Sequence, residues 1–280
     1  MANFNSTDEV KKQYGSPSHL NVRILLHQLY STNKMGWSDW VFQQYHLRPH
    51  QTILELGCGS ANIWRENREK IPHGVKLTLS DFSSGMLDVA KSNTDGCEFV
   101  EAYSIIDVQS IPFADGEFDM VIANHMLYHV PNVKMALGEI ARVLKSDGVF
   151  YATTIGNNNF IELIHLLHDF DEEMDYAHDS ITKAFGLESG KDLLEQYFHS
   201  VESKRHEDSL HITKTKPLVD YVLSLQGVGN VKDIIIGEKV DQFTRYIKQI
   251  IEGKGFIDIT KDAGILISRA PRVLQAERGV

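Results

Sequence analysis

The chain has 280 residues, of which 42% are hydrophobic and 24% are charged, and its formal net charge at pH 7 is −10. This composition is typical of a globular protein with one large core or two small ones, and no apolar stretch approaches the length that crosses a bilayer. The negative charge argues against a nucleic-acid partner, because proteins that bind nucleic acids usually carry a basic surface that neutralises phosphates.

The first 48 residues are predicted to form a helical cap, with two aromatic-rich helices at 19–30 and 36–45. The N-terminus lacks the basic and apolar blocks of a secretory signal. Two cysteines, Cys58 and Cys97, offer neither a disulfide framework nor a metal-binding spacing. We therefore expect a reduced, cytoplasmic protein.

Residues 49–156 are predicted to form the core of an α/β fold, in which strands and helices alternate. The apolar run before Gly57 contains one charged residue, Glu55, as expected of a strand covered on both faces. Gly57 and Gly59 allow a sharp turn and the close approach of a ligand to the backbone. Asp81 follows the next strand, where a carboxylate can accept hydrogen bonds from both hydroxyls of a ribose. The pattern predicts a site for an adenosine-bearing cofactor.

The glycine turn departs from the pattern of nicotinamide sites, which have Gly or Ala three positions after the second glycine, where this chain has Asn62. An acidic residue, one spacer and Gly-x-Gly resemble the first motif of the class I S-adenosylmethionine-dependent methyltransferases. The resemblance implies that Glu55 and the loop of Gly57, Cys58 and Gly59 face the methionine and ribose parts of the cofactor.

The stretch after the second strand resembles the same family. Residues 81–87 read Asp-Phe-Ser-Ser-Gly-Met-Leu, which matches the family pattern of an acid, Ser two positions later, and Met-Leu. Ser83 is predicted to cap the following helix. Phe82 and Met86 are candidates to pack on the faces of the adenine, although a Met at helical spacing is as often part of the core.

A third segment, residues 106–113, resembles the turn with which the family contacts adenine: an acid, a short apolar residue, and then Ile-Pro-Phe. The resemblance implies that Asp107 accepts a hydrogen bond from the adenine amino group. It also implies that the amide of Val108 faces a ring nitrogen. An ordinary surface carboxylate in a loop is the alternative for Asp107.

The fourth strand is predicted to end at Asn124, and the residues after it should face the cleft, because ligands bind at the carboxyl ends of such strands. Asn124 is a further cofactor candidate. His129 is the candidate general base, and His125 is the candidate for lining the cofactor; the two would share one face if the segment were helical. Histidines held by backbone partners are the alternative. We expect no metal site, because no third ligand accompanies this pair.

In related enzymes the N-terminal helices close over the cofactor. Tyr14, Arg23, His27 and Trp37 are therefore candidates for a roof over the transferred methyl group, and Tyr14 is a third catalytic candidate. Anchoring of two helices to the sheet is the alternative role for the aromatic residues of this segment.

The remaining chain is predicted to add a helical lid at 157–200 and, at 201–270, the strands and helices that complete the sheet. Helices are expected at 160–167, 191–198, 217–225 and 240–250, a strand at 201–212, and two strands around a hairpin-like turn at 261–264. The resemblance adds an antiparallel last strand. We thus expect one domain (1–280), built on a doubly wound, Rossmann-like, mostly parallel seven-stranded sheet.

The sequence therefore predicts a methyltransferase that uses S-adenosyl-L-methionine and acts on a small-molecule acceptor by in-line displacement. Two alternatives remain open: a protein that binds S-adenosylmethionine or S-adenosylhomocysteine without catalysis, and a nicotinamide-dependent oxidoreductase. The acceptor and the methylated atom are not specified, because one scaffold serves O-, N-, C- and S-methylation. The oligomeric state is also not specified.

Overall fold

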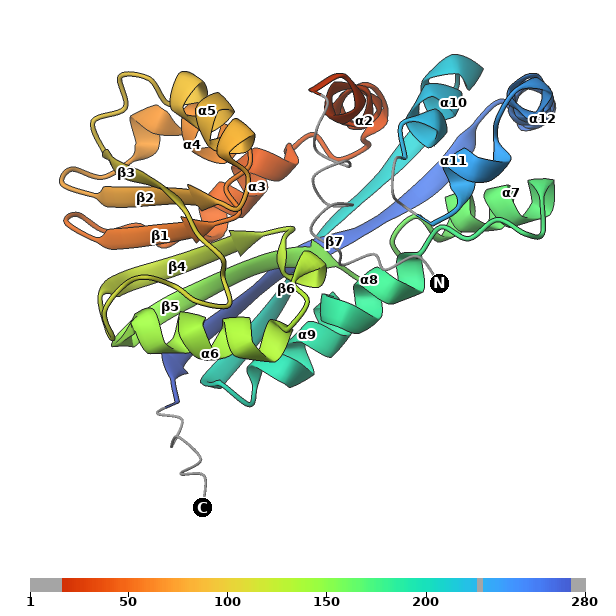
Figure 1. The fold of residues 1–280 in the computed structure, drawn as a ribbon. Coiled ribbons are helices and arrows are strands. Elements are labelled where there is room, and N and C mark those ends of the chain that lie inside the picture. The colour runs from red at the N-terminus through yellow and green to blue at the C-terminus, as the bar shows by residue number, and fades with distance from the viewer. Residues whose placement is uncertain (1–16, 226–228, 273–280) are drawn as a thin grey trace. The chain divides into compact units, whose positions relative to one another are not determined.

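The protein is built on a seven-stranded sheet in the order β3-β2-β1-β4-β5-β7-β6 (Figure 1). The computed structural model describes residues 17–225 and 229–272. Strands β1 to β5 pair in parallel, and β7 runs antiparallel to β5, which confirms the predicted fold class. The strands are β1 (Thr52–Leu56), β2 (Lys76–Asp81), β3 (Val100–Ile105), β4 (Phe118–Asn124), β5 (Leu144–Ile155), β6 (Phe198–Ile212) and β7 (Ile257–Pro271).

Helices precede the sheet and connect most of its strands (Figure 1). They are α2 (Pro17–Tyr30), α3 (Trp37–Gln44), α4 (Asn62–Glu66), α5 (Ser84–Asn93), α6 (Val133–Val143), α7 (Ile161–Phe170), α8 (His178–Phe185), α9 (Leu187–Leu194), α10 (Thr215–Leu223), α11 (Val231–Ile234) and α12 (Glu238–Lys254). Short 3-10 helices occupy Arg68–Lys70 and Leu127–His129. None of these described helices has the length and apolar character needed to span a membrane.

The chain divides into two compact units. Unit 1 consists of Met1–Lys34, Asn157–Ile181 and His206–Asp262, and unit 2 of Met35–Gly156, Thr182–Arg205 and Ala263–Val280. These boundaries differ from the predicted cap (1–48) and lid (157–200), and the single-domain organisation stays a prediction.

The sheet of unit 2 has a packed core on each face, because successive side chains of a strand point to opposite sides. Leu54 and Leu56 of β1 belong to the core that contains α6 and α9. Ile53 belongs to the core that contains α3, α4 and α5. Residues of β4 and β5 alternate in the same way, so both faces are apolar and β1 and β4 are buried along nearly their whole length.

The core of unit 1 is formed mainly by helices α2, α7, α10 and α12. Phe160, Phe243 and Ile247 are among its buried residues, and the apolar positions of α12 recur at helical spacing, as predicted. These helices pack with the C-terminal end of β6 and the N-terminal end of β7. Together they bury enough apolar surface to give unit 1 a core of its own.

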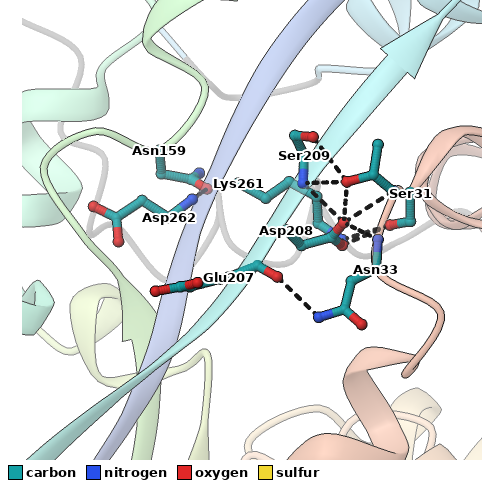
Figure 2. A network of polar contacts seen from close by, with 9 residues as sticks. Ser31, Asn33, Asn159, Glu207, Asp208, Ser209, Lys261 and Asp262 are labelled. Atoms are coloured by element: carbon teal, nitrogen blue, oxygen red, sulfur yellow. Dashed lines mark hydrogen bonds and ion pairs between the residues drawn. The ribbon is translucent and has the colours of Figure 1, made fainter.

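The predicted hairpin-like turn at 261–264 is wrong, because β7 continues through it as one strand. Lys261 forms an ion pair with the buried Asp208 and donates to Ser31 Oγ (2.8 Å), as Figure 2 shows. Asp262 accepts from the backbone N–H of Asn158 (3.1 Å). Partners distant in sequence thus hold both charged residues, and they override the local tendency to turn.

The predicted helix at 191–198 is also misplaced: α9 spans Leu187–Leu194, and Phe198 begins β6. Leu187 and Leu194 are buried in the core of unit 2. Phe198 stacks on Phe150 of β5, with the ring centroids 5.9 Å apart. Because of this packing, Phe198 belongs to strand β6 and not to the helix.

Candidate active site

A left-handed glycine turn follows β1, as the sequence predicts. Gly57 and Gly59 have φ of 65° and 53°, in the left-handed region that glycine adopts without the strain that most other residues incur. At Gly57 space is also restricted, since a Cβ there would lie 3.0 Å from the Cβ of Met126. At Gly59 the nearest contact would be ordinary, 3.7 Å to Met86 Cε. The turn therefore depends on glycine at the first position for space and at both for backbone conformation.

Asp81 at the end of β2 holds this turn in place. Its Oδ2 accepts from the Gly59 N–H (3.0 Å) and its Oδ1 accepts from the Ser83 N–H (2.8 Å). Burial raises the pKa of Asp81, and these backbone hydrogen bonds oppose the rise. Each carboxylate oxygen can accept a second hydrogen bond, so capacity for a ligand hydroxyl remains.

Glu55 lies on the face of β1 that carries α3 and α4, and it is 3% exposed. Its Oε2 accepts from Trp64 Nε1 (2.5 Å) and its Oε1 accepts from Asn124 Nδ2 (2.8 Å). Burial raises the pKa of Glu55 to about 7, although both hydrogen bonds lower it, and the nearby charge of Asp81 adds to the rise. The site therefore contains a buried acid, Glu55, and a half-buried acid, Asp81, that interact with each other.

Asn124 at the end of β4 joins Glu55 to a wider network. It donates from Nδ2 to the Tyr45 hydroxyl (2.8 Å) and accepts at Oδ1 from Thr153 Oγ1 (3.2 Å). Burial, followed by the charge of Glu55, raises the pKa of Tyr45 well above its ordinary value, so the phenol stays protonated. Sequence reasoning missed Tyr45, Trp64 and Thr153; the two-residue periodicity of β5 is the signal that could have identified Thr153.

The predicted adenine turn lies between β3 and β4, with Val108 buried and Asp107 exposed. A residue that sequence reasoning also missed fixes this turn: Arg142 of α6 donates to the carbonyls of Ile111 and Phe113, both at 2.8 Å. Glu139 accepts from the Ile111 N–H (2.8 Å). The Arg142 guanidinium beside Glu139 lowers the pKa of that carboxyl.

The stretch after β2 has the predicted helix cap. Ser83 Oγ accepts from the Met86 N–H (3.4 Å), and α5 begins at the next residue. Phe82 is 48% exposed at the carboxyl end of β2. Burial raises the pKa of the Cys58 thiol, with Glu55 adding to the rise, so this cysteine is a neutral side chain of the turn.

The two histidines after β4 do not lie on one helix, so the condition for a shared face is not met. His125 has φ of 49°, and the 3-10 turn covers only Leu127–His129. The His125 ring lies 5.1 Å from the Trp37 ring, and the His129 ring lies 4.5 Å from that of Tyr128. Burial lowers the pKa of His125 to about 4.

The structure thus brings two hydrogen-bonded pairs, Asp81 with Gly59 and Glu55 with Asn124, to one edge of the sheet at the carboxyl ends of β1, β2 and β4. Gly57 and Met86 lie beside this edge. The backbone N–H of His125 connects this residue to the edge, because it donates to Thr153 Oγ1 (3.1 Å). Tyr14 lies outside the described residues. Arg23 and His27 belong to unit 1, and the described residues contain no group of three or more His, Cys, Asp or Glu side chains that could hold a metal ion.

The chain is similar in sequence to known methyltransferases. A family model described as a methyltransferase domain matches residues 54–152. The chain is 28% identical over 189 residues to a malonyl-[acyl-carrier protein] O-methyltransferase of Legionella pneumophila, covering 67% of this chain and 64% of that one. It is 28% identical over 116 residues to a demethylmenaquinone methyltransferase of Desulfitobacterium hafniense, covering 41% and 46%. The chain therefore spans less than two thirds of either relative.

Solved structures share the fold. A Haemonchus contortus phosphoethanolamine N-methyltransferase in complex with S-adenosylhomocysteine aligns with a TM-score of 0.56 at 14% identity, covering 97% of this chain and 61% of that one. The YcgJ protein of a Bacillus aligns with a TM-score of 0.55 at 16% identity, covering 84% and 98%. At these identities, the likeness shows a common fold.

Proposed function

We propose that this protein is an S-adenosylmethionine-dependent methyltransferase acting on a small-molecule acceptor. The match of residues 54–152 to a methyltransferase-domain family supports this proposal. One observation carries the proposal: Glu55 and Asp81 are two acids in one site, and no Lys or Arg pairs with either among the described residues. Such a site favours a cationic ligand. S-adenosylmethionine has a sulfonium and an ammonium, whereas a nicotinamide dinucleotide brings a negatively charged pyrophosphate.

The residues of the edge fit the parts of this cofactor. Asp81 has acceptor capacity for the ribose hydroxyls, and Glu55 with the glycine turn would hold the methionine part beside Asn124. Asp107 and the Val108 amide would bind the adenine, with Phe82 and Met86 against its faces. Once bound, the cofactor supplies a methyl group on a positively charged sulfur, which is an activated electrophile.

The protein's own contribution is chiefly to position the acceptor. Alignment of a nucleophile with the methyl group is worth up to roughly 7–11 kcal/mol in favourable cases. Trp37 and His125 offer aromatic faces, which attract cations. His129 remains the proposed general base, because a base with a pKa near 4, as His125 has, accepts protons weakly at pH 7. The role of Tyr14 stays a prediction.

The relatives support a small organic acceptor without naming it. One is named as an O-methyltransferase of malonyl-[acyl-carrier protein] and the other as a methyltransferase of demethylmenaquinone, so the two are named for different acceptors. The net charge of −10 favours such an acceptor over a nucleic acid. The atom that this chain methylates is left open.

Calorimetric titration with S-adenosylmethionine, S-adenosylhomocysteine and NADH tests the proposal. We expect both adenosyl ligands to bind with dissociation constants on the order of micromolar, about −8 kcal/mol, and NADH to give no saturable heat. Saturable binding of NADH without a response to S-adenosylmethionine would reverse the proposal in favour of an oxidoreductase.

A second measurement separates an enzyme from a protein that only binds the cofactor. Release of S-adenosylhomocysteine is followed while small acceptors with hydroxyl, amine, thiol and activated carbon nucleophiles are supplied in turn. Turnover with any of them eliminates the non-catalytic alternative. Tight cofactor binding without turnover across the whole series would favour that alternative.

A further inference from the structure

Arg23 of α2 brings a positive charge to unit 1, and the residue is half-buried. Its Nε and Nη2 atoms are shielded from solvent, and neither has a hydrogen-bond acceptor in the part of the chain that the structure describes. Arginine is protonated at any physiological pH and has only donors. Shielded donors without an acceptor are costly, and native structures seldom keep them without a reason.

Two tyrosines next to Arg23 do not neutralise it. Burial raises the pKa of Tyr176 and raises that of Tyr221 further, while the charge of Arg23 acts in the opposite direction on both. Both phenols are therefore uncharged near neutral pH. The two hydroxyls interact with each other, so each phenol has the other as a neutral partner.

Aromatic rings form the rest of the surroundings. His27, one turn after Arg23 on α2, lies 5.8 Å from the Phe160 ring and 6.2 Å from the Tyr221 ring. Phe160 and Tyr221 stack at 5.6 Å. The nearby groups are thus aromatic rings and phenols, and none of the ion pairs among the described residues includes Arg23.

We propose that unit 1 holds a binding site for the carboxylate or phosphate group of a small molecule, in which Arg23 binds the negative charge. Nε and one Nη lie on the same edge of a guanidinium and can donate to two oxygens of one anion. In Arg23, these are the nitrogens that lack acceptors. The site requires no cofactor, so this inference goes beyond the proposed methyl transfer and stands independently of it.

Thermal unfolding of the full chain tests the site with two probes, sodium phosphate and sodium benzoate, each against sodium chloride at equal ionic strength. At saturation we expect a specific rise in the unfolding midpoint of about 2–4 °C. In Arg23→Met the rise should disappear. Arg245→Met is the matched control, because Arg245 is exposed on α12 of the same unit. The probe with the larger rise tells whether the site prefers a carboxylate or a phosphate.

Two further readouts separate a ligand site from a structural arginine. In sodium chloride alone, Arg23→Met should unfold at or above the wild-type temperature, because it removes two shielded donors that have no acceptor. Arg23→Lys keeps the charge but loses the planar fork, so its response to either probe should be below half that of the wild type. The proposal is overturned if neither probe stabilises the wild type, or if Arg23→Met responds as the wild type does.

Discussion

Each unit contains a deeply buried carboxylate, and the two are held in opposite ways. In unit 1 the Asp208 side chain is 1% exposed and is paired with Lys261 (Figure 2). Burial pushes its pKa up, but hydrogen bonds from Lys261, the Asn33 N–H and Ser31 outweigh burial and hold the pKa at about 2. In unit 2, Glu55 is 3% exposed and receives only neutral donors, so its pKa rises to about 7.

On the proposed function, the difference separates an acid that serves the fold from one that serves a ligand. Asp208 connects β6 to Ser31 and Asn33 after α2, and its cation belongs to the protein. Glu55 has positioned donors but no cationic partner among the described residues, so in the proposed site it gains a full counter-charge when a positively charged ligand binds. The proposal for Arg23 uses the same argument with the charges reversed, because Arg23 is a cation whose counter-charge would come from an anionic ligand.

The largest expected effect concerns Lys261. In Lys261→Met, Asp208 keeps its burial but loses its counter-charge, so the free energy of unfolding should fall by about 3–5 kcal/mol. Urea unfolding measures this loss. Lys216→Met is the control: that lysine is 83% exposed and pairs with Asp220 in the same unit, and its loss should cost about 0.5 kcal/mol or less. Equal losses in the two variants would contradict a structural role for the Asp208 pair.

The next effect is on ligand binding in unit 2. Asp81→Ala would remove the proposed acceptors of the ribose hydroxyls and release the Gly59 N–H, so the binding of S-adenosylhomocysteine should weaken by about 1.5–3 kcal/mol, roughly 10- to 150-fold. Calorimetry measures it. Asp88→Ala, an exposed position of α5 in the same unit, should bind as the wild type does. An unchanged affinity in folded Asp81→Ala would remove Asp81 from the site.

A third prediction uses the different pKa values of the two acids. Below pH 7 Glu55 is protonated, and a cationic ligand requires the carboxylate, so binding must release the proton. The affinity for S-adenosylmethionine should therefore fall as the pH drops below 7, by up to about tenfold per pH unit, and should level off above 7. Asp208 stays ionised down to about pH 2 and adds nothing in this window.

Glu55→Gln tests whether this slope belongs to Glu55. The variant keeps the shape of the side chain but has no proton to lose, so its affinity should be lower at pH 8 and nearly independent of pH between 5.5 and 8. Titrations at several pH values, in buffers of different ionisation enthalpy, also count the released protons. A slope that persists in Glu55→Gln would assign the titration to another group.

Local patterns predicted much of unit 2, because there the informative residues follow one another in the chain. Glu55, the glycine turn and Asp81 are separated by one strand-helix-strand unit, whose geometry is nearly fixed. Trp64 and Thr153 were missed because their roles depend on which face of a strand or helix meets Glu55 and Asn124. The turn predicted at 261–264 was wrong for a related reason: a partner 53 residues earlier in the chain holds Lys261 in a strand.

The smallest expected effect concerns backbone strain next to Asn124. The left-handed conformation of His125 costs most residues about 1–2 kcal/mol, but Asn adopts it readily. His125→Asn should therefore keep its stability within about 0.5 kcal/mol, whereas the β-branched side chain in His125→Val should lose about 1–2 kcal/mol more. Urea unfolding compares them. Equal stability would mean that the backbone at 125 relaxes freely. If Asn is tolerated, the S-adenosylhomocysteine release rate of that variant reports on the imidazole alone, because the backbone that carries it is unchanged.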